Sequence, residues 1–188
     1  MNTIKVLVPL ASGFEEIEAA AIIDVLRRAE IEVLVASLTD ETLIKGANNI
    51  SIATDLNIKD INVDELDMVV LPGGWDGAYI LVDDANVQKI LKEMDSKGKN
   101  IGAICAAPLA LNKAGVLKQK FTCYPSAEEQ IDECEYMSDK AMVVEDENII
   151  TSRGPATAIC FALKIVKRLK GDDTYNALKS GLLADFCE

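Results

Sequence analysis

The stretch Ile101-Gly102-Ala103-Ile104-Cys105-Ala106-Ala107-Pro108 joins an expected strand to an expected helix through one sharp turn. Residues 101–104 are apolar and have the length of a short buried strand. Pro108 suits the first turn of a helix, where its missing N–H removes no hydrogen bond, and the helix is expected to run to about Ala114. A strand that turns directly into a helix holds the residue at the turn above the sheet, as a nucleophile elbow does. Cys105 occupies that position.

Strand-like and helix-like segments alternate on both sides of this stretch. The expected strands cover residues 4–9, 32–37, 50–55 (an edge strand), 68–71 and 101–104, followed by a hairpin of 141–144 and 148–151. The expected helices cover residues 15–29, a segment around 87–94 that ends at Gly98, 108–114, and a long segment around 159–166 that ends at Gly171. This alternation predicts an α/β fold with a mostly parallel sheet and helices on both faces. With 188 residues, a single domain over residues 1–188 is expected.

Composition narrows the classes of partner. The chain carries 31 acidic and 19 basic residues, a formal charge of −12, which disfavours binding to nucleic acid or to an anionic membrane. No apolar run reaches the roughly 18 residues of a membrane span, and the first residues lead straight into an expected strand. We therefore expect no signal peptide, no membrane and a cytoplasmic location.

The cysteines and the absent histidines limit the chemistry further. The five cysteines are odd in number and form no C-x-x-C pair, so we expect free thiols, with Cys160 a packing residue. The chain has no histidine, which removes Ser-His-Asp triads, Cys-His pairs and most zinc sites. No metal is expected, and acid–base work falls to Asp, Glu, Tyr, Cys or Lys.

Cys105 is the strongest candidate for a reactive group. The N-terminus of the following helix is expected to favour the thiolate and to lower the pKa of the thiol below about 8.5. The alternative interpretation is a buried structural cysteine, and the turn alone leaves both open.

Two further elements fall at the carboxyl ends of expected strands, where ligands bind in such sheets. Gly73 and Gly74 follow the strand 68–71, and their N–H groups together with that of Ala106 are candidates for an oxyanion hole. An ordinary strand-ending turn is the alternative. The segment is not G-x-G-x-x-G, so a dinucleotide site is not expected.

Glu18 is the candidate acid–base group. Glu15, Glu16 and Glu18 lie in the first turn of the helix expected over residues 15–29, where acids are often only structural. Glu18 faces another side of the helix than at least one of the other two. A carboxyl beside a thiolate shares one proton with it, which raises the pKa of the carboxyl. Tyr124, before Pro125, could offer a hydroxyl or be a half-buried aromatic residue.

These segments together resemble the ThiJ/PfpI family, in the branch that contains the parkinsonism-associated protein deglycase. The resemblance covers nearly the whole chain. It rests on five stretches in order, which are residues 11–18 (ASGFEEIE), 24–29 (DVLRRA), 69–74 (VVLPGG), 103–108 (AICAAP) and 151–157 (TSRGPAT).

The resemblance implies a flavodoxin-like three-layer sandwich, usually a homodimer, and a catalytic Cys105 with Glu18. It implies cofactor-independent chemistry on reactive dicarbonyls, either conversion of methylglyoxal to lactate or deglycation of early adducts on proteins. It also places Tyr124 and Pro155 beside the substrate. A redox-sensing or chaperone role of the same cysteine is the alternative, and an intracellular protease or amidase is a third.

One departure from the family pattern concerns Tyr124. Many relatives have a histidine near the cysteine at the place that Tyr124 occupies here, in the stretch Thr122-Cys123-Tyr124-Pro125. A histidine–cysteine dyad is therefore impossible in this chain, which weakens the protease hypothesis most.

Overall fold

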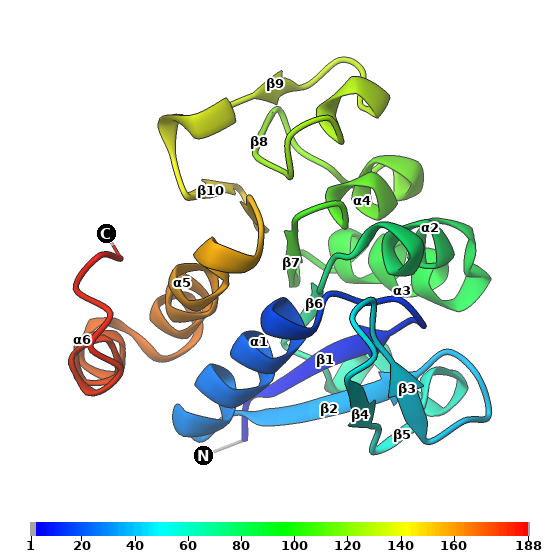
Figure 1. The fold of residues 1–188 in the computed structure, drawn as a ribbon, viewed down its shortest axis with the longest axis horizontal. Helices are drawn as coiled ribbons and strands as arrows, with labels where there is room; N and C mark the ends of the chain where they lie inside the picture. The colour runs from blue at the N-terminus through cyan, green and yellow to red at the C-terminus, as the bar shows by residue number, and fades with distance from the viewer. Residues whose placement is uncertain (1–2, 188) are drawn as a thin grey trace.

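One seven-stranded sheet organises the molecule (Figure 1). The computed structural model describes residues 3–187. Adjacent strands are parallel except for the β10–β11 hairpin, which is antiparallel as predicted. The order across the sheet is β10 (Val143–Asp146), β11 (Ile149–Ser152), β7 (Asn100–Ile104), β6 (Met68–Leu71), β1 (Lys5–Leu10), β2 (Glu32–Ser37) and β5 (Leu56–Asn57).

Helices cover both faces of this sheet, because successive strand residues point to opposite sides. Val6 and Val8 of β1 pack in one core cluster with apolar residues of α1 (Glu16–Arg28) and α5 (Ala158–Lys170). Leu7, between them, packs in a second cluster with residues of α3 (Ala85–Ser96) and α4 (Pro108–Ala114). The expected flavodoxin-like three-layer sandwich is confirmed.

Two helices were not expected from the sequence. α2 (Trp75–Asp83) begins directly after Gly74 and includes Gly77, which made the segment look like an extended turn. α6 (Asp172–Gly181) follows Gly171 and packs against α5, on the outside of the molecule (Figure 1). The other helices agree with the prediction, including the cap of α3, where the Asp84 side chain accepts from two backbone N–H groups.

The expected edge strand over residues 50–55 is wrong in its placement. Ser51–Ala53 forms β4, which pairs with β3 (Leu43–Lys45) in a separate antiparallel hairpin. The edge of the main sheet next to β2 is the two-residue β5. β8 (Lys120–Phe121) pairs with β9 (Glu135–Tyr136) in another small sheet. Five 3₁₀ turns complete the described elements, namely η1 (Ile58–Asp60), η2 (Val63–Glu65), η3 (Glu128–Gln130), η4 (Ser138–Lys140) and η5 (Pro155–Thr157).

The expectation that all five cysteines are free is also wrong. Cys160 of α5 and Cys187 form a disulfide, with their Cα atoms 5.1 Å apart and a sequence separation of 27. The bond forms because α6 reverses the chain and returns the C-terminal segment to α5. Neither an odd cysteine count nor a missing C-x-x-C pair reveals such a long-range pairing. Cys105, Cys123 and Cys134 are free.

Within residues 3–187, no helix is long and apolar enough to cross a membrane.

Candidate active site

Cys105 lies at the turn between β7 and α4, as the sequence predicts. Its φ is +63°, a left-handed conformation that costs energy for a residue with a Cβ. Two long-range hydrogen bonds hold it there: the N–H of Cys105 donates to the Ser152 carbonyl at 3.0 Å, and its carbonyl accepts from the N–H of Tyr124 at 2.8 Å. The neighbouring segments therefore impose the strained turn on Cys105.

Backbone amides face the Cys105 sulfur. The N–H groups of Gly74 and Ala106 interact with it and favour its charged form. Gly74 adopts φ +90°, a conformation open to glycine, and a Cβ there would lie 2.4 Å from the Gly13 carbonyl oxygen. The side chain of Cys105 is almost fully enclosed, since the residue is only 6% exposed. Two of the three amides expected in an oxyanion hole thus meet at the sulfur.

The third expected amide, that of Gly73, has another partner. It donates to Oε2 of Glu18 at 2.7 Å. A Cβ at position 73 would lie 2.5 Å from the Cβ of Cys105 and 2.9 Å from Oε2 of Glu18. Gly73 therefore sits between the thiol and the carboxyl, and the absence of a side chain there lets both approach.

Glu18 differs from its two acidic neighbours, as the helix geometry suggested. Glu15 caps α1 by accepting from the Glu18 N–H at 2.8 Å, and Glu16 binds Asn48 and the Ile50 N–H. Glu18 is fully buried, and among the described residues no group hydrogen-bonds its Oε1. A buried oxygen without a partner is costly, so it marks a place where a proton or a ligand completes the site.

Burial controls the protonation of this pair. It raises the pKa of Glu18 to about 7, against the lowering effect of the Gly73 N–H and the Cys105 thiol. The upward direction expected for the pKa of Glu18 agrees, but its cause is burial and not a neighbouring thiolate. Burial, followed by the charge of Glu18, raises the pKa of Cys105 to about 12, although the Gly74 and Ala106 amides oppose this.

The expectation of a lowered thiol pKa is therefore wrong. The expectation rested on the N-terminus of a helix next to the thiol, but α4 has only seven residues and begins three positions beyond Cys105. It did not include the burial of the sulfur beside a carboxylate, which raises the pKa. Above about pH 7 the pair holds one proton, and its apparent pKa values belong to both groups together.

Tyr124 and Pro155 reach the site by different routes. Tyr124 is joined to Cys105 by the backbone hydrogen bond, and the residue is 41% exposed. Gly154 lies beneath its ring, where a Cβ would be 3.2 Å from a ring atom. Pro155 begins η5 and is half-buried. It follows β11, whose last residue accepts from the Cys105 N–H. The turn that follows β11 thus lies next to the turn between β7 and α4 that carries Cys105.

Trp75 is a neighbour of the site that the sequence analysis did not single out. It follows Gly74 directly, and its ring meets the Tyr124 ring edge-on with 6.3 Å between centroids. The chain contains one tryptophan, and its position next to a glycine turn was the available signal.

An elbow thiol beside a buried carboxyl, with two backbone N–H groups at the sulfur, is the arrangement of an α/β protein of the nucleophile-elbow class. Comparison with known proteins identifies the family. Residues 4–168 match the model of the DJ-1/PfpI family. The chain belongs to this family, and the resemblance found in the sequence is confirmed.

Similar proteins span nearly all of the chain. Protein dj-1beta of Drosophila melanogaster is 42% identical over 182 residues, covering 96% of this chain and 97% of its own, and its crystal structure superposes with a TM-score of 0.92. Glutathione-independent glyoxalase DJ-1 of Schizosaccharomyces pombe is 33% identical, covering 95% of this chain and 98% of its own. The structure of Toxoplasma gondii DJ-1, described as oxidized, is 36% identical, with a TM-score of 0.90 over 96% of this chain and 98% of its own.

Proposed function

We propose that the protein is a cofactor-independent glyoxalase that converts reactive dicarbonyls such as methylglyoxal to hydroxy acids such as lactate. One observation carries the proposal: a buried carboxyl with an unpartnered oxygen lies beside a thiol whose sulfur faces two backbone N–H groups. Relatives named glutathione-independent glyoxalase in Schizosaccharomyces pombe and Caenorhabditis elegans support it.

In the first step, Cys105 adds to the aldehyde carbon of the substrate. The Glu18 carboxylate accepts the thiol proton while the S–C bond forms, because with a pKa of about 7 it is ionised in about half of the molecules at pH 7, while Cys105 is still a thiol. The carbonyl oxygen becomes an oxyanion, which the N–H groups of Gly74 and Ala106 stabilise. Glu18 returns this proton to the oxyanion, which gives a hemithioacetal and restores the carboxylate.

Glu18 then moves a proton between the two substrate carbons. Its carboxylate removes the C–H proton of the hemithioacetal, and an enediolate forms. Return of a proton to the neighbouring carbon gives a thioester of Cys105. Water hydrolyses the thioester to lactate and restores the thiol, so the sum is methylglyoxal plus water to lactate. Glu18 suits this role because its pKa of about 7 lets it both take and return a proton.

Lactate formation from methylglyoxal by the purified protein tests the proposal. Cys105→Ala should reduce the rate to that of the uncatalysed reaction. Cys123→Ala is the matched control, since Cys123 is also a free, buried thiol but contacts Glu128 and not Glu18. Equal rates for the parent and Cys105→Ala would rule out cysteine-dependent glyoxalase activity.

A redox-sensing role of Cys105 is the second candidate, supported by the relative whose structure is described as oxidized. A protonated Glu18 would donate a short hydrogen bond to a sulfinate on Cys105. The high pKa of the thiol works against rapid oxidation. Peroxide titration followed by intact and peptide mass compares Cys105 with the more exposed free thiol Cys134. Faster oxidation of Cys134 would exclude a dedicated sensor.

Action on glycated proteins, a homodimer and a cytoplasmic location remain part of the proposal. A light-scattering mass near the 20.3 kDa of one chain at micromolar concentration would contradict the dimer.

Cell fractionation tests the cytoplasmic location. The Cys160–Cys187 disulfide is unusual for that location, because cytosolic thiols are normally kept reduced. Deglycation is tested with a glycated peptide in place of methylglyoxal. An amidase or protease is disfavoured because the chain has no histidine to protonate a leaving amine.

A further inference from the structure

Three exposed aromatic rings form a continuous group next to Cys105, which we call the aromatic rim: Trp75, Tyr79 and Tyr124. The rings of Trp75 and Tyr79 are stacked with 6.0 Å between centroids, one helical turn apart on α2. The Tyr124 ring approaches Trp75 edge-on. Each of the three residues is between 37% and 45% exposed, so a substantial part of each is available to a ligand.

Two residues of the aromatic rim are connected through the backbone to the groups around the Cys105 sulfur. Trp75 is the residue after Gly74, whose N–H faces the Cys105 sulfur, and the Tyr124 N–H donates to the Cys105 carbonyl. Both rings are therefore carried by residues adjacent to the groups that would hold the oxyanion. The Tyr79 hydroxyl and the Gln130 side chain hydrogen-bond at 3.1 Å, which links α2 to the segment that carries Tyr124.

Charge near the rim has both signs. The segments 72–79 and 121–135 contain six acidic and no basic residues, but Arg153 precedes Gly154, which lies beneath the Tyr124 ring, and its charge reaches Cys123, the residue before Tyr124. A neutral planar substituent depends on neither sign of charge, because it stacks on exposed aromatic faces.

We propose that the aromatic rim is a substituent subsite, which makes the protein prefer dicarbonyls with a neutral planar substituent, the arylglyoxals, over methylglyoxal. The proposal rests on the proposed glyoxalase function for its biological meaning. The geometry of the subsite can be tested without turnover. An aryl group attached to the carbonyl next to the Cys105 adduct would lie against Trp75, with Tyr124 at its edge.

A matched pair of alkylating probes tests the subsite directly. Phenacyl bromide and bromoacetone both form an S–C bond with Cys105, release bromide and differ only in a phenyl or methyl substituent. The labelling rates are followed by intact mass and peptide mapping, and each is divided by the rate for N-acetylcysteine. We expect the phenyl-to-methyl ratio of the parent to exceed that of the free thiol by about fivefold.

Variants assign this preference to the rings. Trp75→Ala should bring the ratio to that of the free thiol, and Trp75→Phe should keep most of it. Tyr124→Phe retains the ring without the hydroxyl and should keep the ratio, whereas Tyr124→Ala should lower it. Phe186→Ala is the control, because Phe186 is an exposed aromatic residue in the segment after α6, and α6 lies on the opposite side of the molecule from α2 (Figure 1). Circular dichroism verifies that each variant is folded.

The only tryptophan supplies a second readout, because its fluorescence reports on the rim alone. The phenacyl adduct of Cys105 should shift Trp75 emission, and the acetonyl adduct should not. Equal normalised ratios in the parent and Trp75→Ala would overturn the subsite even if methylglyoxal is converted to lactate. A high ratio without any turnover would leave the subsite standing and reject the glyoxalase function. With turnover, kcat/KM for phenylglyoxal relative to methylglyoxal should fall about fivefold in Trp75→Ala.

Discussion

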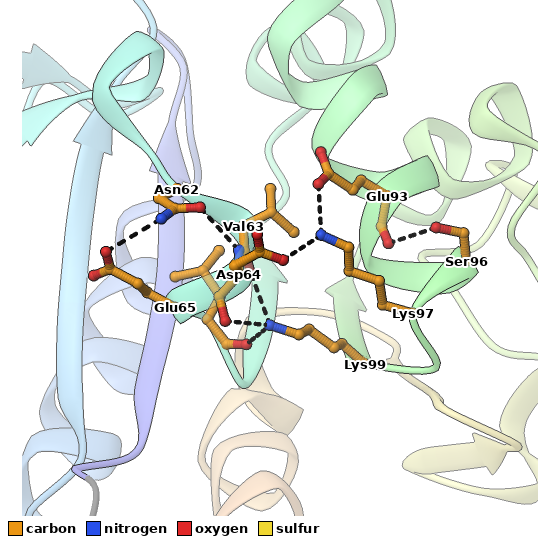
Figure 2. Close-up of polar contacts among 9 residues, drawn as sticks. Asn62, Val63, Asp64, Glu65, Glu93, Ser96, Lys97 and Lys99 are labelled. Atoms are coloured by element: carbon orange, nitrogen blue, oxygen red, sulfur yellow. Dashed lines mark hydrogen bonds and ion pairs between the residues drawn. The ribbon is translucent and has the colours of Figure 1, made fainter.

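The two ends of strand β7 are built in opposite ways. At the start of the strand, the Lys99 ammonium donates to the carbonyls of Val63, Asp64 and Leu66 at 2.8, 2.8 and 2.6 Å (Figure 2). The surrounding side chains are paired as well, in a network that joins η2 to the end of α3. At the other end, Cys105 is held in a left-handed conformation beside a carboxyl oxygen without a partner.

The two ends of β7 therefore serve different purposes, since the Lys99 end stabilises the fold and the Cys105 end carries the candidate reactive groups. The Lys99 end satisfies its polar groups, so it contributes to the free energy of unfolding and offers no unpaired group to a ligand. The Cys105 end accepts backbone strain and a buried carboxyl, features that persist when the rest of the fold compensates for them. Changes at the two ends should therefore affect different observables.

The largest effect is expected from Gly73→Ala, which breaks the arrangement at the Cys105 end. The new Cβ would be too close to both the Cys105 Cβ and Oε2 of Glu18, so the thiol and carboxyl would be forced apart. Dicarbonyl turnover should fall by about a hundredfold or more, the scale of losing a positioned acid–base group. Gly181→Ala is the control, since a Cβ there meets nothing within 4 Å. Turnover retained in Gly73→Ala would show that the close approach is not required.

The second prediction uses pH to expose the cost of burying Glu18. The pKa of Glu18 is about 7 in the folded protein and 4.5 when unperturbed, so between these values the folded state binds more protons than the unfolded state. The free energy of unfolding should therefore fall as pH rises from about 4.5 to 7. The shift corresponds to about 3 kcal/mol.

Urea denaturation of the parent and Glu18→Gln at pH 5 and pH 8 checks this. The neutral amide should remove the loss, which makes the variant more stable than the parent at pH 8 and about equal at pH 5. The full effect requires the sulfur to stay protonated over this range, as its pKa of about 12 implies. A parent whose stability stays nearly level with pH in the same window would mean that the sulfur loses its proton before Glu18 does, since the folded and unfolded pairs would then each hold about one proton.

The same contrast explains what the sequence could and could not predict. Cys105 and Glu18 were found because each is marked by local pattern, a strand–turn–helix junction and the first turn of an amphipathic helix. The Cys160–Cys187 disulfide was missed because it depends on a chain reversal over 27 residues. The direction of the Cys105 pKa was missed because burial is a property of the assembled core. The three bonds of Lys99 leave no local pattern, since backbone carbonyls carry no sequence signal.

The third prediction concerns Lys99→Met, which removes the hydrogen bonds at the start of β7. The carbonyls of Val63, Asp64 and Leu66 lose a charged donor, and the methionine cannot replace it. We expect a loss of about 2 kcal/mol in the free energy of unfolding, the scale of removing hydrogen bonds to a charged group. Dicarbonyl turnover should not change, because Lys99 lies at the end of β7 opposite to Cys105. A variant with parental stability and reduced turnover would contradict the separation of the two ends.

The smallest effect is expected from the same substitution two residues earlier, Lys97→Met. Lys97 pairs with the side chains of Asp64 and Glu93, which are exposed enough for water to take the place of the ammonium (Figure 2). Exposed ion pairs contribute little to stability and are screened by salt. The urea midpoint should stay within error of the parent. The pKa of Asp64, which its hydrogen bond to Lys97 and the charge of that lysine lower, should rise toward the ordinary value in an NMR titration. The two Lys→Met variants thus make the same chemical change, once at a lysine bound to backbone carbonyls and once at a lysine paired with exposed carboxylates. Equal destabilisation by both would mean that the number of contacts determines the stability of this end, and not the difficulty of finding another donor for the part-buried Val63 and Leu66 carbonyls.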